Sequence, residues 1–285
     1  MLVSERIGQL FLSSGDRLEF TEYGGGERWA VLLHAELMTR RMHQPLARRL
    51  ASEGFHVLAL DLLGHGRSDR PSDPLAYSVT AYAEQVEALL DEVGAEQALL
   101  VGVSLGANVA LETAVRSPDR VRGLLLESPV LDNGFAAGLL RMAPLMLGAR
   151  VAPLAFSGVR RLVRAVPRGV MPFWVGVALD TCNQRPGALA AMVHGVLFGR
   201  MAPNAGERRG IGVPVLLVGH RADPAHPWAD VEMLAAELPQ ATVVRSRGPL
   251  EWRLDPARLD GAAISFALDC WDARSTRKRQ RRSST

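Results

Sequence analysis

The chain has 285 residues, of which 48% are hydrophobic, and a formal net charge of +3. This length allows a large core, in one domain or in one domain with an insertion. No uncharged apolar run approaches the roughly 18 residues that span a membrane, and the first residues lack the pattern of a secretory signal. The only cysteines, Cys182 and Cys270, are too few for a disulfide framework. We therefore expect a cytoplasmic protein.

The charge is unevenly distributed. Residues 272–285 hold six basic side chains and one acidic one, so this tail carries +5 and the rest of the chain carries −2. The tail is rich in serine and arginine, a composition typical of disorder. We predict a disordered basic tail over 272–285, and we do not expect it to contact nucleic acid or a membrane.

Strand-like and helix-like segments alternate along most of the chain. Apolar runs bounded by turn residues predict eight strands, at 7–12, 18–23, 29–33, 55–60, 97–103, 121–126, 213–218 and 241–245. Helical spacing of apolar residues predicts helices at 45–53, 82–93, 105–116, 229–238 and 259–271. This alternation predicts an α/β fold with a mostly parallel, doubly wound sheet of eight strands.

The alternation stops between residues 129 and 209. This segment is rich in leucine, methionine, proline and glycine, and it has no acidic residue between Asp132 and Asp180. We interpret it as a helical insertion over the carboxyl edge of the sheet. The predicted organisation is thus a core domain over 1–128 and 210–271, an insertion over 129–209 and the tail over 272–285.

The most informative motif is Gly102-Val103-Ser104-Leu105-Gly106, which lies between a buried strand and a helix. A strand that passes directly into a helix needs a very tight turn, and small flanking residues let the two elements approach. Such a turn exposes the Ser104 hydroxyl above the sheet edge, close to the free amides that begin the helix. The pattern favours a nucleophilic serine over one that merely caps the helix.

Several motifs together resemble the α/β-hydrolase superfamily over roughly residues 5–271. They are Leu32-Leu33-His34, the segment from Asp61 to Asp69, the Ser104 turn, the helical insertion and the segment from Val218 to Pro224. The resemblance implies a serine–acid–histidine triad in that chain order, an oxyanion hole and a cap that shapes substrate choice.

Carried over position by position, the resemblance makes Ser104 the nucleophile and Asp223 the triad acid, with Glu127 as an alternative acid. The backbone amides of Leu105 and Glu36 would form the oxyanion hole. A carboxylate at position 36 is a departure, because its negative charge would oppose the charge that develops on an acyl intermediate unless it is paired or points away.

The triad histidine is the larger departure. The loop that normally carries it, here residues 246–256, has no histidine. His226 is the only histidine after Asp223, so we name it as the candidate base. Other candidates are His43, His194 and Glu251, because a buried carboxylate can also act as a general base.

The insertion contains six arginines from Arg141 to Arg168, interspersed with apolar residues. Three of them, Arg160, Arg161 and Arg164, share one face of a predicted helix, opposite its apolar residues. The simpler interpretation is a cap helix that buries its apolar face on the sheet. The alternative is a basic rim that attracts an anionic substrate, a carrier or a membrane surface.

The residues lack cysteine or histidine spacings suited to zinc, and they lack a phosphate loop or dinucleotide fingerprint. We therefore predict no metal and no cofactor. Two functions stay open: a hydrolase that cleaves an ester, thioester or related acyl bond of a small, apolar substrate, and a non-hydrolytic ligand- or partner-binding module on the same fold. The sequence leaves the oligomeric state open.

Overall fold

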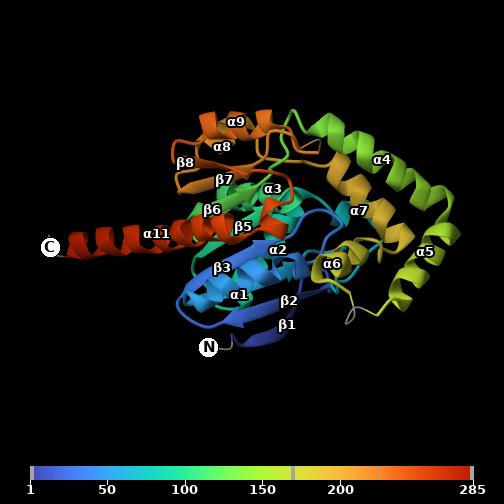
Figure 1. Cartoon of the computed structure of the whole chain (residues 1–285), viewed down its shortest axis with the longest axis horizontal. Helices are drawn as coiled ribbons and strands as arrows, with labels where there is room; N and C mark the ends of the chain where they lie inside the picture. Colours follow the sequence, from blue (N-terminus) through green and yellow to red (C-terminus); the bar gives the residue numbers. More distant parts are fainter. Residues whose placement is uncertain (1–2, 168–170, 224, 283–285) are drawn as a thin grey trace.

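A computed structural model describes residues 3–167, 171–223 and 225–282. An eight-stranded sheet runs through the molecule in the order β1-β2-β4-β3-β5-β6-β7-β8 (Figure 1). The β1–β2 and β2–β4 pairs are antiparallel, and all the other neighbouring strands are parallel. The predicted fold class is therefore confirmed. The strands are β1 Glu5–Phe11, β2 Arg17–Gly24, β3 Arg28–Leu33, β4 Phe55–Asp61, β5 Ala98–Val103, β6 Val121–Glu127, β7 Val215–Gly219 and β8 Ala241–Arg245.

Helices cover both faces of the sheet (Figure 1). One face packs against α1 (Gln44–Ser52) and α11 (Ala257–Arg282). The other packs against α2 (Val79–Glu92), α3 (Leu105–Arg116) and α9 (Trp228–Glu237). The shorter helices are η1 Arg40–His43, η2 Pro74–Ala76, η3 Pro118–Arg120, α8 Ala205–Arg209 and α10 Glu251–Leu254.

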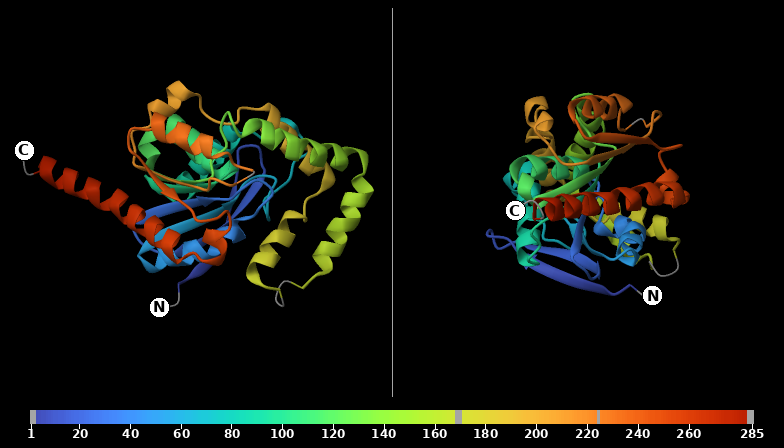
Figure 2. Two further views of the ribbon diagram at one scale, coloured as in Figure 1. Left: turned by 45° about the horizontal axis from the view of Figure 1, so that its top comes forward. Right: turned by 90° about the vertical axis from the view of Figure 1, so that its left-hand side faces the viewer.

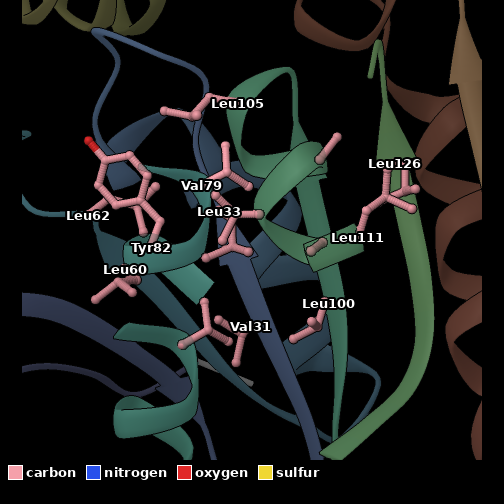
Figure 3. Packing of buried hydrophobic residues seen from close by; sticks show 14 of the residues in the cluster. Val31, Leu33, Leu60, Leu62, Val79, Tyr82, Leu100, Leu105, Leu111 and Leu126 are labelled. Carbon is pink, nitrogen blue, oxygen red and sulfur yellow. The ribbon is translucent and has the colours of Figure 1, made fainter. Parts of the chain in front are cut away.

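The central strands are apolar on both faces because both faces are covered. In β3, Val31 and Leu33 pack into the cluster that contains α2 and α3, whereas Ala30 and Leu32 pack toward α1. Figure 3 shows the first cluster, with Leu105 at the end nearest the turn at Ser104, which we call the elbow. This packing fixes the register of β3 and β5, and therefore the position of the elbow between β5 and α3.

In the part of the chain that the structure describes, four helices connect β6 to α8 and β7. They are α4 (Phe135–Val151), α5 (Pro153–Ala165), α6 (Phe173–Thr181) and α7 (Pro186–Phe198). Most of α7 is buried, and it packs against α4. Together α4 and α5 form a bent arm that extends beyond the sheet (Figure 2). Within the described residues, no single helix is both long and apolar enough to cross a membrane, and α4 and α5 meet that test only as a pair bent by 102°.

The interpretation of the helix that carries Arg160, Arg161 and Arg164 as one that buries its apolar face was wrong. Among the described residues of α5, none is buried, and Leu154 and Leu162 are 87% and 73% exposed. Two arginines of this helix, Arg160 and Arg164, line a cleft on the other side together with Arg70 and Arg185. The helix therefore turns its apolar face outward, and periodicity alone cannot say which face of an amphipathic helix meets the core.

The structure continues α11 to Arg282, through most of the segment that composition predicts to be disordered. Arginine, lysine and glutamine are good helix formers, and residues 262–282 contain neither glycine nor proline. The helix is nucleated where it packs on the sheet, and extending it costs little beyond that point.

Candidate active site

The elbow places Ser104 in a left-handed conformation, with φ 52° and ψ −112°. Its two flanking glycines are required by close backbone contacts. A Cβ at Gly102 would lie 2.2 Å from the Gly106 carbonyl oxygen, and one at Gly106 would lie 2.1 Å from the Leu33 carbonyl oxygen. The Ser104 amide donates to the Glu127 carbonyl at 2.9 Å, which ties the turn to β6. The conformation is uncommon for a residue with a side chain, and the packing of three strands maintains it.

The structure brings three of the predicted site residues into one hydrogen-bonded chain. The Ser104 hydroxyl lies 3.0 Å from His226 Nε2, and His226 Nδ1 lies 2.9 Å from Asp223 Oδ2. A carboxylate only accepts, so Nδ1 carries the proton and Nε2 is free to accept the proton of the hydroxyl. This is the donor–acceptor order that a general base beside a serine requires.

Asp223 also organises the loop that carries His226. Its Oδ1 accepts hydrogen bonds from the amides of Ala225 and His226, at 2.8 and 3.2 Å. This arrangement is an Asx turn, in which a side-chain oxygen takes the place of a backbone acceptor. Partial burial raises the pKa of Asp223, but the hydrogen bonds from His226 and Ala225 outweigh burial and hold the pKa below its ordinary value. Asp223 is thus anionic at neutral pH.

The alternative acid has another partner. Glu127 accepts a 2.6 Å hydrogen bond from Arg253, a residue of α10 in the 246–256 loop where the resemblance led us to expect the base. The Arg253 guanidinium also lies over the rings of Trp174 and Trp252. The Glu127 carboxylate is therefore held in an ion pair, while its carbonyl supports the elbow.

The other candidate bases are engaged elsewhere. Glu251 pairs with Arg258 and accepts from the Arg247 amide. His194 lies 3.3 Å from an Arg150 nitrogen, and burial lowers the pKa of His43 to about 3. None of these three forms a hydrogen bond with Ser104 within the described part of the chain.

A small cleft opens beside the serine. Ser104, Leu105 and Glu36 line it together with Arg141, and α4 and α7 supply part of the wall. The rest of the lining is mainly apolar, from Val79, Val130, Met142, Val196, Leu197 and Met201. Leu105 is the first residue of α3, where a backbone amide has no acceptor within the helix.

Glu36 is the unusual residue of this cleft. The residue is partly buried, and its Oε1 atom is buried without a hydrogen-bond partner. Burial raises the pKa of Glu36 to about 7, and the positive charge of Arg141 offsets this only in part. About half of the Glu36 side chains are thus neutral at pH 7, which relieves the conflict between a carboxylate and a developing oxyanion.

Sequence reasoning missed two residues that hold the cleft together. Asp230 is completely buried in the first turn of α9 and accepts hydrogen bonds from the amides of Leu131, Asn133 and Gly134. Asn108 of α3 bonds both to Val130 and to the Met201 carbonyl. These two residues fix the ends of the insertion. An acidic residue in the first turn of a helix ordinarily interacts with the amides of that same helix, so the sequence contained no sign that Asp230 binds another segment.

Groups of three or more histidine, cysteine, aspartate or glutamate side chains that could hold a metal ion are absent from the residues that the structure describes.

A family model described as alpha/beta hydrolase fold matches residues 31–252, and the chain belongs to this family. Among curated proteins, it is similar to a putative non-heme haloperoxidase from Mycobacterium phage D29, with 28% identity over 91% of this chain and 94% of the relative. It is also 35% identical to a 2-hydroxymuconate semialdehyde hydrolase from Pseudomonas putida, over 45% of each chain.

Solved structures have the same fold. An enol-lactonase from Burkholderia xenovorans LB400 superposes with a TM-score of 0.73 at 21% identity, over 91% of this chain and 99% of the other. A hydrolase from Pseudomonas aeruginosa PA01 also gives 0.73, at 23% identity over 91% and 97% of the two chains.

Proposed function

We propose that this protein is a serine hydrolase that cleaves an ester, thioester or related acyl bond of a small, apolar substrate. The observation that carries the proposal is the hydrogen-bonded chain from Ser104 through His226 to Asp223. Membership of the alpha/beta hydrolase fold family and the relative named as a hydrolase support hydrolysis in general. The remaining preference, for acyl substrates, rests on the site.

In the proposed reaction, Ser104 Oγ attacks the substrate carbonyl while its proton passes to His226 Nε2. Asp223 keeps the proton of the imidazole on Nδ1 and stabilises the imidazolium. The amides of Leu105 and Glu36 stabilise the oxyanion. The imidazolium then protonates the leaving group, and water activated by His226 cleaves the acyl-enzyme.

The apolar lining of the cleft is the argument for an apolar acyl group. A series of aryl esters from acetate to octanoate tests it. We expect kcat/KM to rise with chain length, since each buried methylene contributes about 0.8 kcal/mol, and to stop rising when the cleft is full. A kcat/KM that falls steadily from acetate onward would contradict an apolar acyl pocket.

The nucleophile is tested with a fluorophosphonate probe and intact mass. We expect one adduct on the parent protein and none on Ser104→Ala. Ser128→Ala is a matched control, because Ser128 also has a positive φ of 52° and directly follows β6 at the same edge of the sheet. Absence of labelling on the parent would favour the alternative of a ligand- or partner-binding module.

The cytoplasmic location and the absence of a cofactor remain predictions from sequence. If the protein needs no metal cofactor, the purified protein should keep its full activity in the presence of a chelator.

A further inference from the structure

The arm formed by α4 and α5 exposes an unusual amount of apolar surface. Six of the large hydrophobic side chains that the described part of the chain exposes lie on these two helices, and we call them the arm patch. They are Leu140, Leu147 and Val151 on α4, and Leu154, Val159 and Leu162 on α5. All are between 52% and 87% exposed. Monomeric proteins rarely leave so many large apolar side chains together in water, so a partner surface is indicated.

The spacing shows that these residues form faces rather than scattered positions. Leu140, Leu147 and Val151 are seven and four residues apart, which puts them on one side of α4. Leu154 and Leu162 are two turns apart on α5. The opposite side of α4 carries Met142, which lines the cleft beside Ser104. The arm therefore has an inner face toward the protein and a separate outer face.

The charge of the arm identifies the class of partner. Residues 133–179 contain six arginines and no acidic residue. Arg150 and Arg161 are exposed near the arm patch. A second copy of this chain would bring the same positive charges together without any acidic residue from either arm, which disfavours a symmetric dimer here. An apolar face flanked by cations fits a partner that has an apolar interior beneath an anionic surface layer.

We propose that the arm patch docks on a lipid bilayer that contains anionic headgroups. The apolar side chains would enter the boundary between headgroups and acyl chains, and the arginines would contact the phosphates. The pair is bent by 102°, so α4 and α5 are not one continuous membrane-spanning helix. This inference does not depend on the proposed reaction.

The test is cosedimentation of the full chain with vesicles. The two compositions are phosphatidylcholine alone, and phosphatidylcholine mixed with phosphatidylglycerol at about two to one. We expect the bound fraction to be clearly higher on the mixed vesicles, and to fall when the salt is raised to about 0.5 M because the charges are then screened.

Two double variants locate the contact. Leu154→Asp/Leu162→Asp should weaken binding at least about tenfold, because it removes two apolar anchors and adds repelling charges. Arg150→Glu/Arg161→Glu should weaken binding to the mixed vesicles alone. Ile7→Asp/Phe11→Asp is the matched control, since these side chains on β1 are 61% and 69% exposed but lie outside the arm. Unchanged circular dichroism and fluorophosphonate labelling would show that each variant is folded.

Three outcomes would overturn the proposal. Absence of binding to the mixed vesicles would leave an acidic protein partner as the occupant. Equal losses for the arm and β1 variants would indicate nonspecific adhesion. A dimer in light scattering that Leu154→Asp/Leu162→Asp converts to a monomer would make a second copy the occupant.

Discussion

The elbow and the loop that carries His226 contribute to the same site, but different forces position them. At the elbow, the backbone is confined by contacts of β5 and α3 with β3 and β6, and a single added methyl group would overlap a backbone oxygen. In the loop from His220 to His226, the conformation depends on two amide hydrogen bonds to one carboxylate. Steric confinement tolerates almost no substitution, whereas a hydrogen-bonded loop loses its function gradually.

The largest effect is expected from Gly106→Ala. The new Cβ would lie 2.1 Å from the Leu33 carbonyl oxygen and 2.6 Å from its carbon, and backbone on both sides cannot move independently. We expect loss of more than about 3 kcal/mol of unfolding free energy, or no folded protein. Urea unfolding followed by circular dichroism measures it. Gly261→Ala in α11 is the control, because open space surrounds it and alanine is the better helix former.

A normally stable Gly106→Ala protein would show that the elbow is not confined as described. In that case, the comparison with the loop would fail at its first step.

The second prediction concerns His226. Replacing it with alanine should slow fluorophosphonate labelling of Ser104 by roughly a thousandfold, because an unassisted hydroxyl is a poor nucleophile at neutral pH. The unfolding free energy should change little. His220→Ala is the matched control from the same loop, since the His220 ring accepts a hydrogen bond from the Ala222 amide and forms none with Ser104 among the described residues. If the control loses as much rate as His226→Ala, the loop rather than the imidazole is responsible.

These two regions also show how far the sequence could be interpreted. The strands, the helix after Ser104 and the need for Gly102 and Gly106 follow from patterns of neighbouring residues. The position of His226 does not, because its three-residue separation from Asp223 is equally compatible with a ring that faces solvent. The deciding fact is the pair of amide bonds to Asp223 Oδ1, which only coordinates reveal.

The outward apolar face of α5 is a second case of this kind. Its 3.6-residue periodicity was evident, but a pattern on one helix does not specify which neighbour covers it. Likewise, the partner of Glu127 could not be found from sequence, since Arg253 is 126 residues away.

The third prediction separates the two candidate acids. Asp223→Asn should reduce the labelling rate by about a hundredfold, because it removes the charge that stabilises the imidazolium and disturbs the tautomer. Glu127→Gln should reduce the rate by less than about threefold, since that carboxylate pairs with Arg253. Stopped-flow labelling at saturating probe measures both. The reverse ranking would make Glu127 the triad acid and would leave Asp223 with a structural role in its loop.

The smallest effect concerns Glu36, whose Oε1 atom is buried without a hydrogen-bond partner in the wall of the cleft beside Ser104. Its pKa is about 7 in the folded protein, against an ordinary value of 4.5. The unfolded chain therefore releases this proton more readily, so the contribution of Glu36 to stability is fully present below about pH 4.5 and is lost as the pH rises through 7. The loss should be roughly 2–3 kcal/mol.

Glu36→Gln keeps the shape of the neutral acid and removes the titration. The buried His34, His43 and His65 have lowered pKa values, so their contribution to stability changes in the opposite sense, rising with pH. Because both proteins contain these histidines, their contribution cancels when the unfolding free energy of the parent is subtracted from that of Glu36→Gln. We expect this difference to grow between pH 4.5 and 7 in favour of the variant. A constant difference across that range would mean that Glu36 ionises normally, and that the cleft beside Ser104 is more open to water than its packing indicates.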